Sequence, residues 1–440
     1  MKLVLKNKGI EDYKKKSRER FSELEFPIWK RLKMKGLYLG ELSDYNKDYI
    51  LSGSDNDYLF DIEHMNEFGA VLLEHQRPLE DVLDIKRKYG VDRKFTTLAE
   101  GYASTGFLYY APKNHKRKEA IEINFKLDQY NPTVINHNLI VAEAGSEGKI
   151  IVHYNDDLFK PQTKTMVKAN VESQVGSHAE SQAKVKSVRM SEQGIDEEKR
   201  LDIVDELAIG TYSYYHIGLT KIIAHTDAKV TLIRMQDFSD YVLHIDNTVA
   251  TIAKDAKVTY NSIDLGGHVV VTDYTAYMDG DGSGSESRTA YLGSGKRRLD
   301  IGFNLFHTGK HTESLIRTKG ALLGESRKIF RGNMKFERGS KRSTGSESEY
   351  VLLLDKRVHS DAIPALLCDE DDVQGEHAAS AGQVNDNQLY YLMSRGFSKK
   401  EAMKLIIHGN FAEFMDSLPS EAYRNYIDEE LNRRLVYGDD

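Results

Sequence analysis

The sequence predicts a mainly β protein in which a parallel β-solenoid is flanked by helical regions. Short β-branched segments separated by turn residues recur between residues 101 and 380, and almost no helical period occurs between 205 and 365. The pentapeptide Asp227–Thr231 returns as Asp255–Thr259, 28 residues later, and repeats of this period are typical of stacked coils. The zone also lacks clean two-residue hairpin turns such as Asn-Gly. A β-sandwich with accidental internal similarity is the alternative.

Residues 1–100 read as a helical region. One apolar stripe at helical spacing, closed by Pro27, comprises Tyr13, Ser17, Phe21 and Leu24. A second helix is expected from Pro78 to Gly90, because acidic residues follow the proline and three basic residues precede the glycine. That order of charges complements the helix dipole.

Residues 101–380 form the predicted β core. Its clearest strand segments are Gly106–Tyr110, Asn138–Val141, Lys149–Val152, Tyr241–Ile245 and His268–Val271. A solenoid exposes unpaired strand edges at both ends, and such edges invite further pairing. We expect the chain's own helices to cover one end. The other end would then be free to pair with a second protein by strand addition.

Residues 381–440 return to helical patterns. The segment Gln388–Met393 precedes Gly396, a residue typical of helix ends. A capping box, Ser398 followed by Glu401, opens a second helix. A last helix after Pro419 has one apolar face made of Tyr423, Ile427, Leu431 and Leu435.

The overall composition disfavours several functional classes. Lys and Arg number 61 against 68 Asp and Glu, a net charge of −7, which argues against a nucleic-acid binder. No apolar run is long enough for a membrane span, and the first residues do not resemble a signal peptide. The single cysteine, Cys368, cannot form an internal disulfide or a four-cysteine metal site, and it fits a reducing cytoplasm.

Several short motifs imitate ligand sites without completing them. The run Gly293–Lys296 lacks the earlier glycine and the final Ser or Thr of a phosphate loop. The run Asp279–Gly284 lacks the bidentate glutamate of a calcium loop, since Ala290 holds that position. Histidines among the predicted strands could align into a metal site, but polar residues satisfied in turns or inside a coil are the better interpretation. They are His225, His244, His268, His307, His311 and His359.

One acidic segment combines donors that suit iron or zinc. Asp371, Asp372, Glu376 and His377 lie together where the β zone gives way to helices. A solvated acidic loop is the alternative on the residues alone. No Ser-His-Asp or Cys-His arrangement can be argued from spacing, so we do not expect an enzyme.

The same segment carries a resemblance to a known family. The runs Asp371–Gln383 and Asn387–Gly396 resemble the C-terminal signature of the SufB/SufD family of iron–sulfur cluster assembly proteins. Gly106–Asn114, His137–Val141 and Phe330–Gly332 also look like family positions. The Ala-Gly-Gln after the histidine and the short N-terminal region favour the SufD branch, with a SufB-type subunit as the alternative. A polysaccharide-active β-helix enzyme is the competing class.

The resemblance implies a right-handed parallel β-helix and a non-catalytic scaffold. It implies pairing with SufB through the β-helix ends, or a homodimer when the chain is isolated, and binding of the SufC ATPase at the C-terminal helices. No cofactor would be bound stably; iron or a nascent cluster would be held transiently near His377, with Glu376 as a further candidate. Some relatives carry cysteine where this chain has Gly375. The candidate ATPase-docking residues, for which core packing is the alternative, are Leu389, Tyr390, Met393, Phe397 and Leu405.

Overall fold

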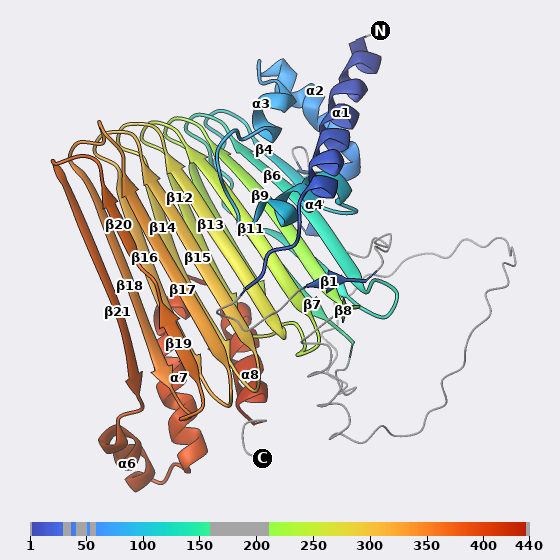
Figure 1. Cartoon of the computed structure of the whole chain (residues 1–440). Coiled ribbons are helices and arrows are strands. Elements are labelled where there is room, and N and C mark those ends of the chain that lie inside the picture. The colour runs from blue at the N-terminus through green and yellow to red at the C-terminus, as the bar shows by residue number, and fades with distance from the viewer. Residues whose placement is uncertain (1, 30–36, 41–50, 53–58, 159–210, 437–440) are drawn as a thin grey trace, which may run out of the picture.

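The chain winds into a parallel β-solenoid of about eight turns with helices before and after it (Figure 1). The structure is a computed structural model that describes residues 2–29, 37–40, 51–52, 59–158 and 211–436. The predicted solenoid is therefore confirmed, and the β-sandwich alternative is wrong.

Two sheets form the walls of the solenoid, and most turns contribute one strand to each. The nine-stranded sheet contains, in order, β2 (Leu51–Ser52), β5 (Ile121–Leu127), β7 (Glu147–Asp156), β10 (Lys229–Gln236), β12 (Lys257–Asp264), β14 (Gly284–Gly293), β16 (Glu313–Leu322), β18 (Ser343–Leu353) and β21 (Val373–Gln383). The ten-stranded sheet contains β19 (His359–Ala362), β17 (Arg327–Phe336), β15 (Arg298–His307), β13 (Val269–Met278), β11 (Leu243–Ile252), β9 (Tyr215–Ala224), β6 (Thr133–Ala142), β4 (Phe107–Ala111) and β3 (Leu59–Asp61), with β20 (Ala365–Cys368) beside β17. A separate pair joins β1 (Tyr38–Leu39) to β8 (Thr211–Tyr212).

The sequence repeat corresponds to one turn of the solenoid. Lys229 pairs with Lys257 and Thr231 with Thr259, so the two copies stack in register on β10 and β12. Asp227 and Asp255, which begin the copies, both have positive φ, at 58° and 55°. Aspartate tolerates this left-handed conformation better than most residues. The repeat thus encodes one turn and the strand that follows it.

Alternate side chains of each strand point into the solenoid, where most of them form an apolar core between the two sheets. Tyr260 of β12 stacks on Tyr274 of β13 with ring centroids 4.4 Å apart, an example of contact across the interior. The opposite faces of the sheets pack against helices or face solvent. A shift of one residue along any strand therefore moves a side chain from the interior of the solenoid to its outer face.

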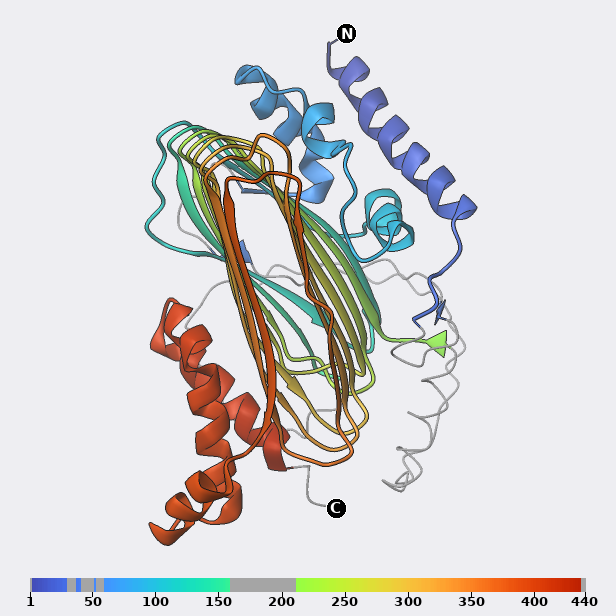
Figure 2. The same ribbon diagram turned by 60° about the vertical axis from the view of Figure 1, so that its left-hand side comes forward.

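The N-terminal helices cover part of the outer face of the ten-stranded sheet. They are α1 (Lys2–Glu23), a 3₁₀ turn η1 (Ile62–His64), α2 (Met65–Glu74), α3 (Leu79–Leu83) and α4 (Arg93–Tyr102). Phe95 and Leu98 of α4 are buried in the same cluster as Tyr215, Ile217 and Leu219 of β9. Figure 2 shows these helices and the C-terminal helices on opposite sides of the solenoid.

The helix expected from Pro78 to Gly90 is wrong beyond Leu83, where α3 ends. The following backbone bonds to the solenoid instead of continuing the helix. The buried Lys221 ammonium donates to the Leu83 carbonyl at 2.5 Å, and the amide of Gly90 donates to Asp273 at 3.1 Å. Tertiary contacts thus override the favourable order of charges.

The C-terminal helices agree with the predicted positions. They are α6 (Asp386–Ser394), α7 (Lys399–Ser417) and α8 (Glu421–Val436), and the capping box of Ser398 and Glu401 is formed. Helices α7 and α8 pack along the outer face of the nine-stranded sheet through Ile407, Phe411 and Ile427. They do not extend over the end of the solenoid (Figure 2).

The two ends of the solenoid differ. At the N-terminal end, β2 pairs antiparallel with β5 and β3 with β4. Strands rather than the expected helices therefore line this edge, because only extended backbone can satisfy edge N–H and C=O groups in a ladder. At the C-terminal end, no strand in the described part of the chain pairs beyond β19, β20 or β21. We call this end the open rim.

Candidate functional site at the open rim

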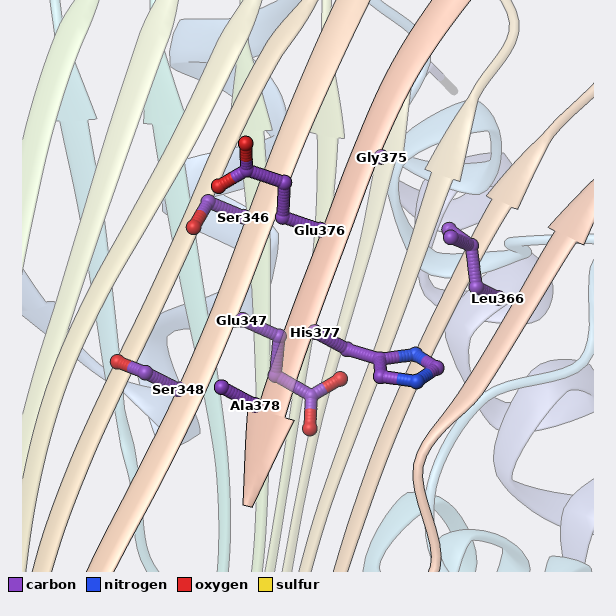
Figure 3. Close-up of a pocket in the computed structure, with 8 residues that line it drawn as sticks. All are labelled: Ser346, Glu347, Ser348, Leu366, Gly375, Glu376, His377 and Ala378. Carbon is purple, nitrogen blue, oxygen red and sulfur yellow. The ribbon is translucent and has the colours of Figure 1, made fainter. Parts of the chain in front are cut away.

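A groove of about 520 Å³ lies at the open rim, between the last strands of the two sheets. Figure 3 shows its lining residues, which come from β18, β20 and β21. They are Ser346, Glu347, Ser348, Leu366, Gly375, Glu376, His377 and Ala378. The acidic segment expected as a loop or metal site is, from Val373 onward, the edge strand β21.

The strand register separates the two residues that the sequence suggested as a pair. Glu347 of β18 is the Cα partner of His377 of β21, and Ser346 is the partner of Glu376. Because side chains alternate along a strand, His377 and Glu376 lie on opposite faces. In Figure 3 the Glu347 carboxylate and the His377 ring lie on one side of the sheet, whereas Glu376 points to the other. No motif in the sequence singles out Glu347, which the register places beside His377.

Glu347 is an unusual carboxylate for this position. Its side chain is 1% exposed, although the neighbouring His377 is exposed. Neither carboxylate oxygen has a hydrogen-bond partner among the residues that the structure describes. Burial, together with repulsion from Glu349, raises the pKa of Glu347 to about 7. The group can therefore carry a proton or a charge near neutral pH.

Glu349, two residues along the same strand and on the same face, has the opposite environment. It accepts hydrogen bonds from the buried ammonium of Lys328 at 2.6 Å and from the hydroxyl of Tyr291 at 2.8 Å. Its charge is thus balanced by a cation of the chain itself. In the described part of the chain, no such cation lies within hydrogen-bond distance of Glu347.

Gly332 of β17 creates the space for the Glu347 carboxylate. A Cβ atom at residue 332 would lie 2.1 Å from Cδ and 2.2 Å from Oε1 of Glu347, which is far too close. The run Phe330–Gly332 was recognised in the sequence only as a family position. The structure gives its glycine a physical role at the groove.

The described residues do not form a complete metal site by themselves. No group of three or more His, Cys, Asp or Glu side chains in the described ranges is arranged to hold a metal ion. Glu347 and His377 offer one oxygen and one nitrogen donor, a set that suits iron or zinc. Cys368, at the end of β20, is an exposed free thiol on the same rim. Any further donors would have to come from outside the described chain.

Two of the other histidines singled out in the sequence, His244 and His307, are buried polar residues with hydrogen-bond partners. His244 lies inside the solenoid, with 2.9 Å from its Nδ1 to Nδ1 of His216. His307, also buried, contacts the hydroxyls of Thr312 at 2.7 Å and Ser314 at 2.9 Å. Internal hydrogen bonding, and not metal ligation, accounts for both.

The candidate docking residues lie on α6, in the connection that follows it and in the first half of α7, and most of them are exposed apolar side chains. Tyr390 is 75% exposed, and Met393, Phe397 and Leu405 are also exposed, while Leu389 is half-buried. Core packing is therefore wrong for four of the five. Tyr391, which the sequence analysis did not select, is exposed on the same helix. No described helix is long and apolar enough to cross a membrane.

Comparison with known proteins finds similar sequences. Residues 194–410 match the family model described as the SUF system FeS cluster assembly SufBD core domain. The chain is 25% identical over 386 residues to an iron–sulfur cluster assembly protein SufD of Bacillus subtilis, a match that covers 85% of this chain and 76% of that protein. It is 24% identical to an iron–sulfur cluster assembly SufBD family protein of Staphylococcus aureus, covering 82% and 68% of the two chains.

Proposed function

Because this chain belongs to the SufBD family of iron–sulfur cluster assembly proteins, we propose that it is a non-catalytic scaffold subunit of a SUF complex. In this proposal it pairs with SufB through the open rim and binds the SufC ATPase through α6 and α7. The nascent cluster, which is cargo and not a resident cofactor, forms beside His377. The free thiol of Cys368 favours the reducing cytoplasm as its location.

The observation that carries the proposal is the contrast between the two ends of the solenoid. At one end the short antiparallel strands β2 and β3 pair with parts of β5 and β4, whereas the outer edge of the eleven-residue β21 has no paired strand in the described chain. An exposed edge of this length favours strand addition by another protein. Strand β21 carries small residues along this edge, so a second backbone can approach it closely. They are Ala378, Ala379, Ala381 and Gly382. A second copy of this chain would use the same edge when SufB is absent.

The apolar surface of α6 favours a docking site for the ATPase. Replacing Tyr390 and Met393 with aspartate should lower recovery of SufC with the tagged complex at least about tenfold, because charge would enter an apolar contact. Tyr130→Asp is the matched control, since Tyr130 is also 75% exposed but lies between β5 and β6. Equal recovery of SufC by the double variant and the control would contradict docking at this surface. Recovery of SufB should be the same for all three proteins.

Removing the His377 side chain should separate assembly of the complex from assembly of the cluster. We expect His377→Ala to leave recovery of SufB and SufC unchanged, because the exposed ring contributes little to packing. The rate of cluster formation, followed by visible absorption, should fall roughly tenfold if the ring is a ligand. An unchanged rate would refute the role of His377 while leaving the scaffold proposal intact.

A further inference from the structure

We propose that Glu347 and His377 together bind a divalent cation at the open rim. The identification of this cation as Fe²⁺ rests on the proposed function; the site itself rests on the arrangement of the two side chains. The site is an incomplete one, in which the chain supplies two donors and leaves the remaining positions accessible through the groove.

The register brings the two donors to one ion. Cα partners on adjacent parallel strands lie about 4.8 Å apart, and here both side chains project from the same face. Imidazole nitrogen and carboxylate oxygen bind divalent ions such as zinc at about 2.0–2.2 Å. Side chains of these lengths can therefore converge on an ion placed in the groove between them.

The environment of Glu347 indicates that a positive charge is missing. Glu347 and Glu349 project into the same interior. Among the described residues, Lys328 and Tyr291 bind Glu349, and none donates to Glu347. A buried carboxylate with no partner is costly, and natural proteins retain such a group where it serves a purpose. Gly332 leaves space for this carboxylate at the position where it faces the groove. A cation from outside would satisfy Glu347 as Lys328 satisfies Glu349.

A site with two protein donors suits cargo that must leave again. Structural metal sites close four positions with protein ligands, whereas open sites keep positions for exchangeable groups. Water, sulfide or donors of a pairing subunit would fill the positions that this chain leaves open. Weak holding by one nitrogen and one oxygen then allows iron to enter a cluster and the product to depart.

The alternative is a purely structural Glu347 that stays protonated. Glutamine has nearly the same shape and no charge, so it would replace a protonated glutamate without loss. It cannot replace an anionic metal ligand. The substitution E347Q therefore separates the two explanations.

The test is titration of the purified full-length chain with Co²⁺ alone, followed by calorimetry and by the visible bands of the bound ion. We expect E347Q and H377N each to weaken binding at least about tenfold. G332A should weaken it as well, because its methyl group displaces the Glu347 carboxylate. The matched control is E376Q, which removes a carboxylate from the neighbouring residue on the opposite face and should leave binding unchanged.

Folding is measured in parallel by thermal denaturation. E347Q should melt at the same temperature as the unaltered chain or higher, so that a loss of Co²⁺ binding cannot be assigned to unfolding. Absence of Co²⁺ binding by the unaltered chain, or equal binding by E347Q, would overturn the inference. Recovery of SufB and SufC tests the proposed function separately, and E347Q should recover both.

Discussion

Replacing both Ala379 and Ala381 with lysine is expected to abolish pairing through the open rim while leaving the solenoid folded. These alanines are the Cα partners of Glu349 and Val351, which point into the solenoid, so the new side chains would also point inward. In the isolated chain both positions are exposed, and water would solvate the ammonium groups. Once a partner strand covers the rim, both ammonium groups would lose their hydration between successive coils, and the one at position 381 would lie beside the apolar Val351, a cost of several kcal/mol.

The matched control places the same two lysines on the other face of the same strand. Ala378 and Ser380 pair with Ser348 and Tyr350, and they point away from the interior. Lysines there should stay solvated and leave pairing intact. Size-exclusion chromatography with SufB measures the result, and the melting temperature of each variant measures folding. Loss of pairing by both double variants, or by neither, would argue against strand addition at β21.

The solenoid could be predicted from the sequence because each turn repeats local chemistry. Lys229 and Lys257 show the same strand chemistry one turn apart, and Asp227 and Asp255 show the same turn. The capping box at Ser398 is equally local, as it needs only four residues of chain. Features of this kind do not depend on distant contacts, so they were recognised without coordinates.

Only one of the two facing side chains of the candidate site could be predicted from the sequence, because the other depends on the register between β18 and β21. Donor chemistry and the family resemblance both indicated His377, but Glu376 was paired with it because the two are adjacent in sequence. Had the segment been interpreted as a strand, the two-residue period would have placed Glu376 on the opposite face. The partner of His377, Glu347, lies one coil earlier, and the sequence repeat was too weak to fix that register. The early end of the helix after Leu83 has a similar cause, because the buried Lys221 and Asp273 belong to distant strands.

Arg234→Ala is expected to destabilise the solenoid by about 3–5 kcal/mol, the cost of breaking a buried ion pair. Arg234 of β10 is 2% exposed and lies inside the solenoid. Its guanidinium donates to Asp264 at 2.7 Å and to the hydroxyl of Tyr260 at 3.1 Å, and it lies 3.4 Å from Asp246. Removing it leaves two buried carboxylates without a cation. The free energy of unfolding in denaturant measures the loss.

The surface variant Arg317→Ala provides the comparison, because that side chain is 48% exposed where it pairs with Glu413. An exposed ion pair contributes about 1 kcal/mol or less, so this variant should stay close to the unaltered chain. Equal stability of the two variants would mean that the buried network contributes nothing.

The dependence on pH identifies the mechanism of the Arg234 effect. Burial already raises the pKa of Asp246 to about 6 with Arg234 present, and loss of the guanidinium would raise the pKa of this carboxyl further. The folded variant would then hold protons that the unfolded chain releases above about pH 4. Asp246 is largely protonated below about pH 6 even in the unaltered chain, and stability falls with rising pH wherever the folded state binds more protons. The deficit of Arg234→Ala should therefore grow as the pH rises above about 6. A deficit that is constant over this range would assign the effect to lost packing instead of uncompensated charge.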